Sequence, residues 1–170
     1  YKKRGLWAII NAGSNSKLAS GICDVQKMSN MGINLAVGTD GPSSNNALDM
    51  FREMYLISVL QKLKYNDAAA MDANEILKAA TSGSAKCMGL TDCDCIAEGK
   101  LADLMIIDLE RPNMQPINNI TKNLVYSGSK DDVKMTMING KILYENGEFV
   151  NIDKEEIYAK AQEICNRLKN

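Results

Sequence analysis

The 170-residue sequence contains no histidine, the side chain most often used as a zinc ligand and as a general base near neutral pH. No complete histidine-dependent site can therefore be built from this chain alone. An excess of one charge is also missing, because 20 basic residues are balanced by 21 acidic ones. That balance argues against the basic stripe of a nucleic-acid-binding surface and against an anionic-membrane patch. Small neutral molecules and proteins remain as the expected partners.

Cysteine is present, but not in a pattern that builds a disulfide framework. The five cysteines form an odd set without regular spacing: Cys23, Cys87, Cys93, Cys95 and Cys165. Such a set predicts a reducing cytoplasm. Cys93 and Cys95 form a C-x-C pair, but no second pair supplies the remaining ligands of a tetrahedral zinc site. We interpret these thiols as incidental rather than as metal ligands.

The residues that are present have an ordinary globular composition, 45% hydrophobic and 24% charged. Apolar runs at 6–10 and 33–37 predict two strands that are buried on both faces. Between them, residues 23–31 show a helical apolar period that ends before Gly32, a favoured residue after a helix. Strand, helix, strand is a βαβ unit, so the two strands are expected to run parallel in one sheet.

Helices are predicted after the second strand. The longest covers residues 47–64, with a cap among residues 44–46, and shorter helices follow at 72–80 and 81–88. Because strands and helices alternate along this part of the chain, the helices are expected to cover a parallel sheet. The first part of the chain is therefore predicted to be α/β.

Further along the chain, the pattern changes to strands and turns. Residues 102–108 read as a strand, and residues 133–144 read as two strands joined by Asn139-Gly140. Asn-Gly favours a type I′ hairpin turn because both residues accept a positive φ. Residues 153–169 have the apolar period of an amphipathic helix, which would close the chain.

Asp40 is the strongest candidate for chemistry. It follows the second predicted strand within Gly38-Thr39-Asp40-Gly41, at the edge of a parallel sheet where ligands and catalytic groups gather. The alternative is an aspartate that only caps the turn into the next helix. A polar loop is expected at 14–21, directly after the first strand, as a weak substrate loop or a plain connection.

Four segments resemble one enzyme family. SNSKLASGI (14–22) and GTDGPSSNNALDM (38–50) look like the seventh and eighth strand regions of the 5-methylthioadenosine/S-adenosylhomocysteine deaminases. These belong, with chlorohydrolases and guanine deaminases, to the amidohydrolase superfamily. EGKLADLMIID (98–108) and INGK (138–141) are similar to the stretch where that family's chain leaves its barrel and completes a small β domain. The similarity runs through residues 5–150.

The resemblance implies a fold and a division into domains. The expected fold class is α/β, comprising the C-terminal part of a (β/α)8 TIM barrel, the C-terminal strands of a small β-sandwich domain and a closing helix. Residues 1–92 would contain barrel strands seven and eight with their helices. Residues 93–150 would form part of the composite β domain, and 151–170 the C-terminal helix. The chain is thus expected to be a fragment of a longer enzyme.

The resemblance also implies a metal site. In that family a divalent metal is held by a His-x-His pair on the first strand, single histidines on the fifth and sixth, and an aspartate on the eighth. Only the aspartate has a counterpart here, as Asp40, which is therefore predicted to be a metal ligand, a catalytic group and a substrate contact. The metal is expected to be zinc, with iron as the alternative, and to activate water at neutral pH.

Asn15 is the second predicted substrate-binding residue. Ser14 and Asn15 are expected first to order their own loop, since short polar side chains commonly bond nearby backbone, and only second to lie near a substrate. Ile10-Asn11-Ala12 stand where relatives usually have His-Asn-Pro. The substrate contact of that histidine is therefore not available to this chain.

The resulting hypothesis is a cytoplasmic, metal-dependent deaminase that releases ammonia from an adenine-containing nucleoside. This chain alone, with one metal ligand, is expected to be inactive and not to retain the metal. The alternatives are a guanine deaminase or chlorohydrolase, or a non-catalytic truncated module for binding or assembly. Because an opened barrel leaves unpaired strand edges, self-association into homo-oligomers is also expected.

Overall fold

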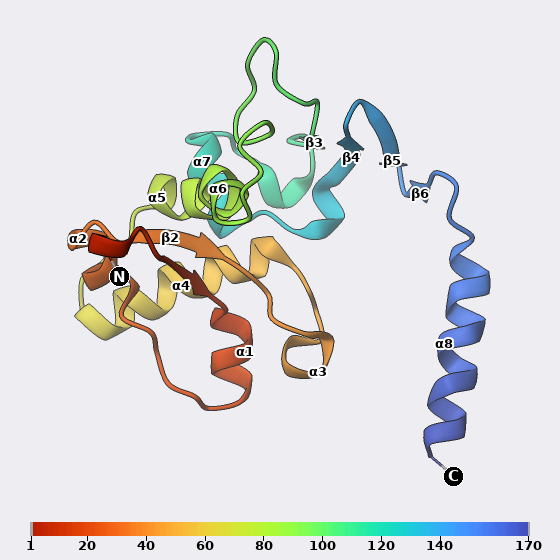
Figure 1. Ribbon diagram of the computed structural model, residues 1–170, viewed down its shortest axis with the longest axis horizontal. Coiled ribbons are helices and arrows are strands. Elements are labelled where there is room, and N and C mark those ends of the chain that lie inside the picture. The colour runs from red at the N-terminus through yellow and green to blue at the C-terminus, as the bar shows by residue number, and fades with distance from the viewer. Residues whose placement is uncertain (1, 170) are drawn as a thin grey trace. The chain divides into compact units, whose positions relative to one another are not determined.

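The computed structural model describes residues 2–169, which form two compact units (Figure 1). The first unit extends to Lys100 and continues through Asp108–Asp132. The second comprises Leu101–Ile107 and the described residues from Val133 onward. Together they give a mixed α/β fold with two separate sheets. Within the described range, no helix is both long and apolar enough to cross a membrane.

The first unit contains two strands and most of the helices. Its strands and helices are, in order, β1 (Trp7–Ile10), α1 (Ala12–Lys17), α2 (Val25–Asn30), β2 (Asn34–Val37), α3 (Pro42–Asn45), α4 (Met50–Tyr65), α5 (Ala73–Lys78), a π-helical turn (Ala79–Gly83), α6 (Ser84–Cys87) and α7 (Ile120–Tyr126). Short 3-10 turns occur at Lys2–Arg4, Pro112–Met114 and Lys130–Asp132.

β1 and β2 lie side by side and run parallel, from the pair Trp7 and Asn34 to the pair Ile10 and Val37 (Figure 1). This confirms the predicted βαβ unit, with α2 as its helix. Successive side chains of a strand point to opposite faces. Accordingly, Ile10 is 4% exposed and packs in the helix-covered core, whereas its neighbour Ile9 is 57% exposed.

The outer edge of β2 is covered within the same unit by the helical segment that follows α5. The hydroxyl of Ser84 accepts a hydrogen bond from Val37 N–H and donates one to the Val37 carbonyl, both at 3.1 Å. The backbone of Gly83 lies close to the β2 backbone, because a Cβ at this position would stand 2.5 Å from the Leu35 carbonyl oxygen. The helices predicted at 72–80 and 81–88 form a single helical segment, in which a π-helical turn joins α5 directly to α6.

Two local predictions after the strands were wrong. A polar loop was expected at 14–21, directly after the first strand, but α1 begins at Ala12, immediately after β1, and extends to Lys17. The long helix α4 was expected to be capped among residues 44–46, but Asp49 is its cap and accepts from Phe51 N at 2.9 Å. Residues 44–46 were not available, because Pro42 starts the short helix α3, and proline suits the first turn of a helix.

The second unit is an antiparallel sheet followed by a helix. The strands are β3 (Leu104–Ile107), β4 (Val133–Ile138), β5 (Lys141–Glu145) and β6 (Glu148–Phe149), in that order across the sheet, and the helix is α8 (Lys154–Leu168). Asn139 and Gly140 have φ of +47° and +74°, which confirms the predicted hairpin turn. A second Asn-Gly turn, at Asn146 and Gly147, joins β5 to β6 and was missed.

Candidate metal-ligand site at the strand exits

The carboxyl ends of β1 and β2 bring two segments together. Because the strands are parallel and adjacent, α1 leaves one exit and the stretch from Gly38 to Gly41 leaves the other. Asp40 is solvent-exposed, and its φ is +58°. Aspartate and asparagine adopt this left-handed conformation more readily than most residues, because their short polar side chains can bond locally. The backbone thus presents the Asp40 side chain at the strand-end rim, as predicted.

The Asp40 carboxyl is held by two hydroxyls. Ser14 Oγ donates to Asp40 Oδ2 at 2.7 Å, and Ser44 Oγ donates to the same oxygen at 2.8 Å. The hydrogen bond from Ser14, then those from Ser44 and the Gly41 backbone, lower the pKa of Asp40 below its ordinary value. Hydrogen bonds to a charged carboxylate favour that form. The group therefore carries the negative charge that a cation ligand needs at neutral pH.

A lysine makes a second connection between the two exits. Lys17, in the last turn of α1, donates to the Ser43 carbonyl at 2.8 Å and also to Asn46 Oδ1. Both partners follow Asp40 in the sequence, within and just after α3. The segment carrying Ser14 is therefore attached to the segment carrying Asp40 at two separate points.

A third connection is buried and involves Glu53 on α4. Glu53 is 0% exposed; its Oε2 accepts from Gly13 N–H at 2.8 Å, and its Oε1 accepts from Asn45 Nδ2 at 2.6 Å. The same Asn45 amide donates to the Thr39 carbonyl at 2.7 Å. Sequence reasoning missed Glu53, although a signal existed: it lies four residues before Ile57 and so shares the buried face of α4.

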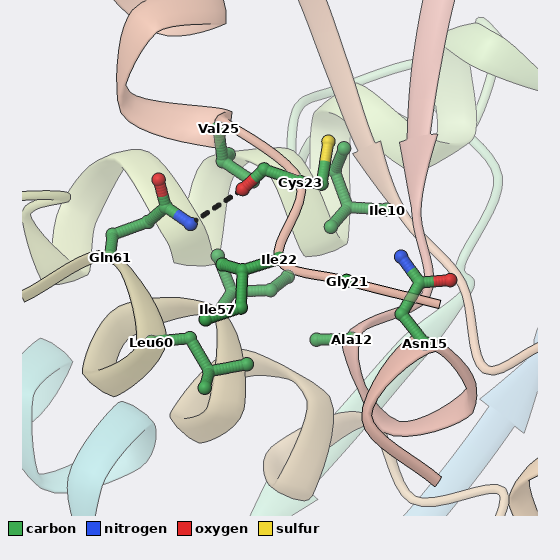
Figure 2. Close-up of a pocket in the computed structure, with 10 residues that line it drawn as sticks. All are labelled: Ile10, Ala12, Asn15, Gly21, Ile22, Cys23, Val25, Ile57, Leu60 and Gln61. Atoms are coloured by element: carbon green, nitrogen blue, oxygen red, sulfur yellow. Dashed lines mark hydrogen bonds between the residues drawn. The ribbon is translucent and has the colours of Figure 1, made fainter. Parts of the chain in front are cut away.

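The other predicted residues occupy a different place. Figure 2 shows Asn15 lining a small pocket with Ile10 and Ala12, across from Gln61, whose Nε2 donates to the Cys23 carbonyl at 2.8 Å. The structure therefore brings Ser14, rather than Asn15, to Asp40, and the substrate-binding role of Asn15 stays a prediction. Ile10 is buried and belongs to the apolar core.

Asp40 can supply one ligand of a metal site but not a complete one. A carboxylate oxygen is a suitable zinc ligand, and structural or catalytic zinc needs at least three protein ligands. Among residues 2–169, no group of three or more histidine, cysteine, aspartate or glutamate side chains is placed to hold a metal. Within the described residues, Asp40 therefore has no further side chains of these types placed to complete a metal site with it.

Comparison with known proteins shows the family of the chain. The model of the amidohydrolase family matches residues 3–143. The chain belongs to the amidohydrolase family. This amidohydrolase chain is 40% identical over 170 residues to the 5-methylthioadenosine/S-adenosylhomocysteine deaminase of Clostridium tetani, and the match covers 99% of the chain. It is 45% identical over 147 residues, 86% of the chain, to the enzyme of that name from Pyrococcus furiosus.

A solved structure extends the similarity to the fold. An adenosine deaminase from Xanthomonas campestris, crystallised with bound zinc, superposes on 99% of the amidohydrolase chain with a TM-score of 0.95 and 37% identity. The chain spans only part of these proteins: 40% of the Clostridium relative, 35% of the Pyrococcus relative and 38% of the Xanthomonas chain.

Proposed function

We propose that this chain is the C-terminal part of a metal-dependent hydrolytic deaminase that acts on an adenine-containing nucleoside. 5-Methylthioadenosine and S-adenosylhomocysteine are the proposed substrates. One observation carries the proposal: Asp40 stands charged at the exit of a parallel strand, held by Ser14 and Ser44. The two deaminases of that name, each at least 40% identical, support the substrate class.

We infer that β1 and β2 are strands seven and eight of a (β/α)8 barrel, and that the second unit is part of a composite β domain. The superposition on 38% of a longer zinc-containing deaminase supports this arrangement. In it, the remaining ligands are histidines of strands outside this chain. The 170-residue chain alone would then be inactive, since a single carboxylate has little chance of retaining a metal. The odd set of cysteines supports a cytoplasmic location.

In the proposed reaction, Asp40 has two tasks. A divalent metal, zinc by preference and iron as the alternative, would supply Lewis-acid activation of water when bound. Asp40 would hold one coordination position of that metal. Its carboxylate would also take the proton lost by the attacking water and deliver it to the amino group that departs as ammonia. Because Ser14 and Ser44 both donate to Oδ2, the carboxyl cannot rotate freely, and this orients it for both tasks.

The test is to express the complete reading frame that encodes this chain, load it with zinc, and measure ammonia release. The substrates are 5-methylthioadenosine, S-adenosylhomocysteine, adenosine, guanine and a chlorotriazine. Deamination of the first two in preference to the others would support the proposal. Activity on guanine alone, or chloride release from the triazine alone, would overturn the substrate class. A protein that binds no zinc under these conditions and shows none of these activities would favour a binding or assembly module.

A further inference from the structure

We propose that Glu53 is a positioning residue that holds Asp40 in place for the metal and the reaction. This inference rests on the proposed function, because it assigns Glu53 a role in the same site. Glu53 itself does not touch Asp40. It acts through Gly13 and Asn45, which belong to the two segments that meet at Asp40.

Both hydroxyls that donate to Asp40 belong to residues adjacent in sequence to a residue bonded to Glu53. Gly13, bonded to Glu53 Oε2, precedes Ser14, the first donor to Asp40. Asn45, bonded to Oε1, follows Ser44, the second donor. Through its amide, Asn45 also holds the carbonyl of Thr39, the residue before Asp40. One carboxyl group thus restrains both donors and the backbone of the acceptor.

Glu53 is buried, and burying a polar or charged side chain costs free energy unless that side chain is hydrogen-bonded. The side chain is 0% exposed, and the partners recorded for it among the described residues are N–H groups rather than a cation. Asn45 Oδ1 is buried without a partner in the same part of the chain. Both oxygens of the buried carboxyl are satisfied by the two segments that meet at Asp40, so this is where its hydrogen bonds act.

The hydrogen-bond pattern predicts that glutamine cannot replace Glu53. Both carboxyl oxygens accept, whereas a glutamine amide has one acceptor oxygen and one NH2 donor. Its NH2 would face either Gly13 N–H or the Asn45 NH2, so one connection must break. Glu53→Gln therefore changes the connections to the Asp40 site while keeping the volume of the buried side chain.

The experiment uses the complete zinc-loaded protein and compares Glu53→Gln with Ser58→Ala. Ser58 is a matched control, because it is also 0% exposed on α4, but it bonds to Tyr126 and the Met71 carbonyl instead of the Asp40 segments. Changes in the residues that support metal ligands typically cost roughly 10–100-fold in metal affinity or activity. We expect Glu53→Gln to lose about that factor in kcat and in zinc affinity, with KM within about twofold. Ser58→Ala should leave kcat and zinc affinity unchanged.

A second variant guards against a folding defect in the first. Asn45→Ala removes the connection from Glu53 to Thr39 without altering the buried carboxyl. If both substitutions break the same set of connected hydrogen bonds, their effects should not multiply. The kcat and zinc affinity of the double variant should then lie within about threefold of those of the more impaired single variant. Losses that multiply, or values of kcat and zinc affinity equal to those of Ser58→Ala, would overturn the role of Glu53.

Zinc affinity, measured by competition with a chelator, separates this inference from the proposed function. A protein that deaminates none of the tested nucleosides, yet binds zinc less tightly after Glu53→Gln, would refute the substrate assignment and support the positioning role. A protein that deaminates them with unchanged zinc affinity and kcat in Glu53→Gln would support the substrate assignment and refute the positioning role.

Discussion

Ser14 and Asp40 are 26 positions apart in the sequence, yet Ser14 Oγ lies 2.7 Å from Asp40 Oδ2. The contact exists because β1 and β2 are parallel neighbours, so the residues that follow them emerge at the same edge. It joins the first turn of α1 to the loop after β2, and it lowers the pKa of Asp40. This pair of residues is the core of the candidate site.

Replacing Asp40 by asparagine should abolish the proposed reaction in the complete protein. Asparagine keeps the shape of the side chain but removes the charge that binds a cation and the group that accepts a proton. Since changes around metal ligands cost roughly 10–100-fold, loss of a ligand should exceed about 100-fold in kcat/KM. Zinc content by atomic absorption should fall in parallel. Full zinc occupancy with full activity in Asp40→Asn would show that another residue is the ligand.

Replacing Ser14 by alanine should raise the pKa of Asp40, because the largest cause lowering it is removed. A carboxyl with a depressed pKa contributes stability above its unfolded value, here 3.8, and loses it as the pH falls through the folded value. In Ser14→Ala the stabilisation should be smaller, and its loss should be complete at a higher pH, because the folded pKa moves back toward the unfolded value. Carboxyl NMR titration measures the shift, and Ser16→Ala, an exposed serine of the same helix, is the control. An unchanged Asp40 titration would mean that the bond does not form in solution.

Replacing Gly140 by alanine should destabilise the hairpin between β4 and β5. Gly140 has φ of +74°, where a Cβ is strained, and the cost of a left-handed L-residue is about 1–2 kcal/mol. The neighbouring change Asn139→Gly should be nearly neutral, because glycine accepts the φ of +47° found there. Urea unfolding of both variants gives the comparison. Equal stability of Gly140→Ala and the parent would argue against this turn.

The 170-residue chain by itself is predicted to self-associate. Ile9 is 57% exposed on β1, and among the described residues β1 pairs only with β2, which leaves its other edge open. Ile9→Lys should reduce association, because a charge on a strand face or edge disfavours pairing with another chain.

The control for this prediction is Ile96→Lys. Ile96 is 89% exposed outside the strands, so the same added charge should have little effect there. Light scattering after size exclusion measures the mass of each variant. A monodisperse monomer for the unmodified chain at high concentration would contradict the prediction. If Ile9→Lys and Ile96→Lys reduce association equally, the reduction comes from the added net charge and not from the edge of β1.

Features with a local cause were predicted well. The apolar runs around Ile9 and Leu35 indicated two parallel strands, although burial on both faces was wrong for β1, where Ile9 is 57% exposed. Asn139-Gly140 indicated a turn, because a positive φ restricts the residue types that can form it. Asp40 was singled out from its position after a strand, and its role as a metal ligand stays a prediction. The resemblance to deaminases could also be identified from the sequence, because it consists of motifs whose residues are contiguous in the chain.

Other features were missed because their cause lies far away in the sequence. Residues 14–21 looked like a polar loop, yet α1 covers their first part. In the same helix, Gly13 N–H bonds to a carboxyl group 40 positions later. Glu53 itself resembles any charged position of a helix, and only the packing of α4 against the strand exits makes it a buried acceptor.

Local chemistry thus indicates where most of the strands and turns lie and which carboxylate follows a strand exit. Whether Asp40 is held by Ser14, and whether Glu53 supports both, depends on long-range packing. The physical reason is that a hydrogen bond over 26 or 40 positions leaves no periodic pattern in the chain. It appears only when parallel strands bring their exits to one edge.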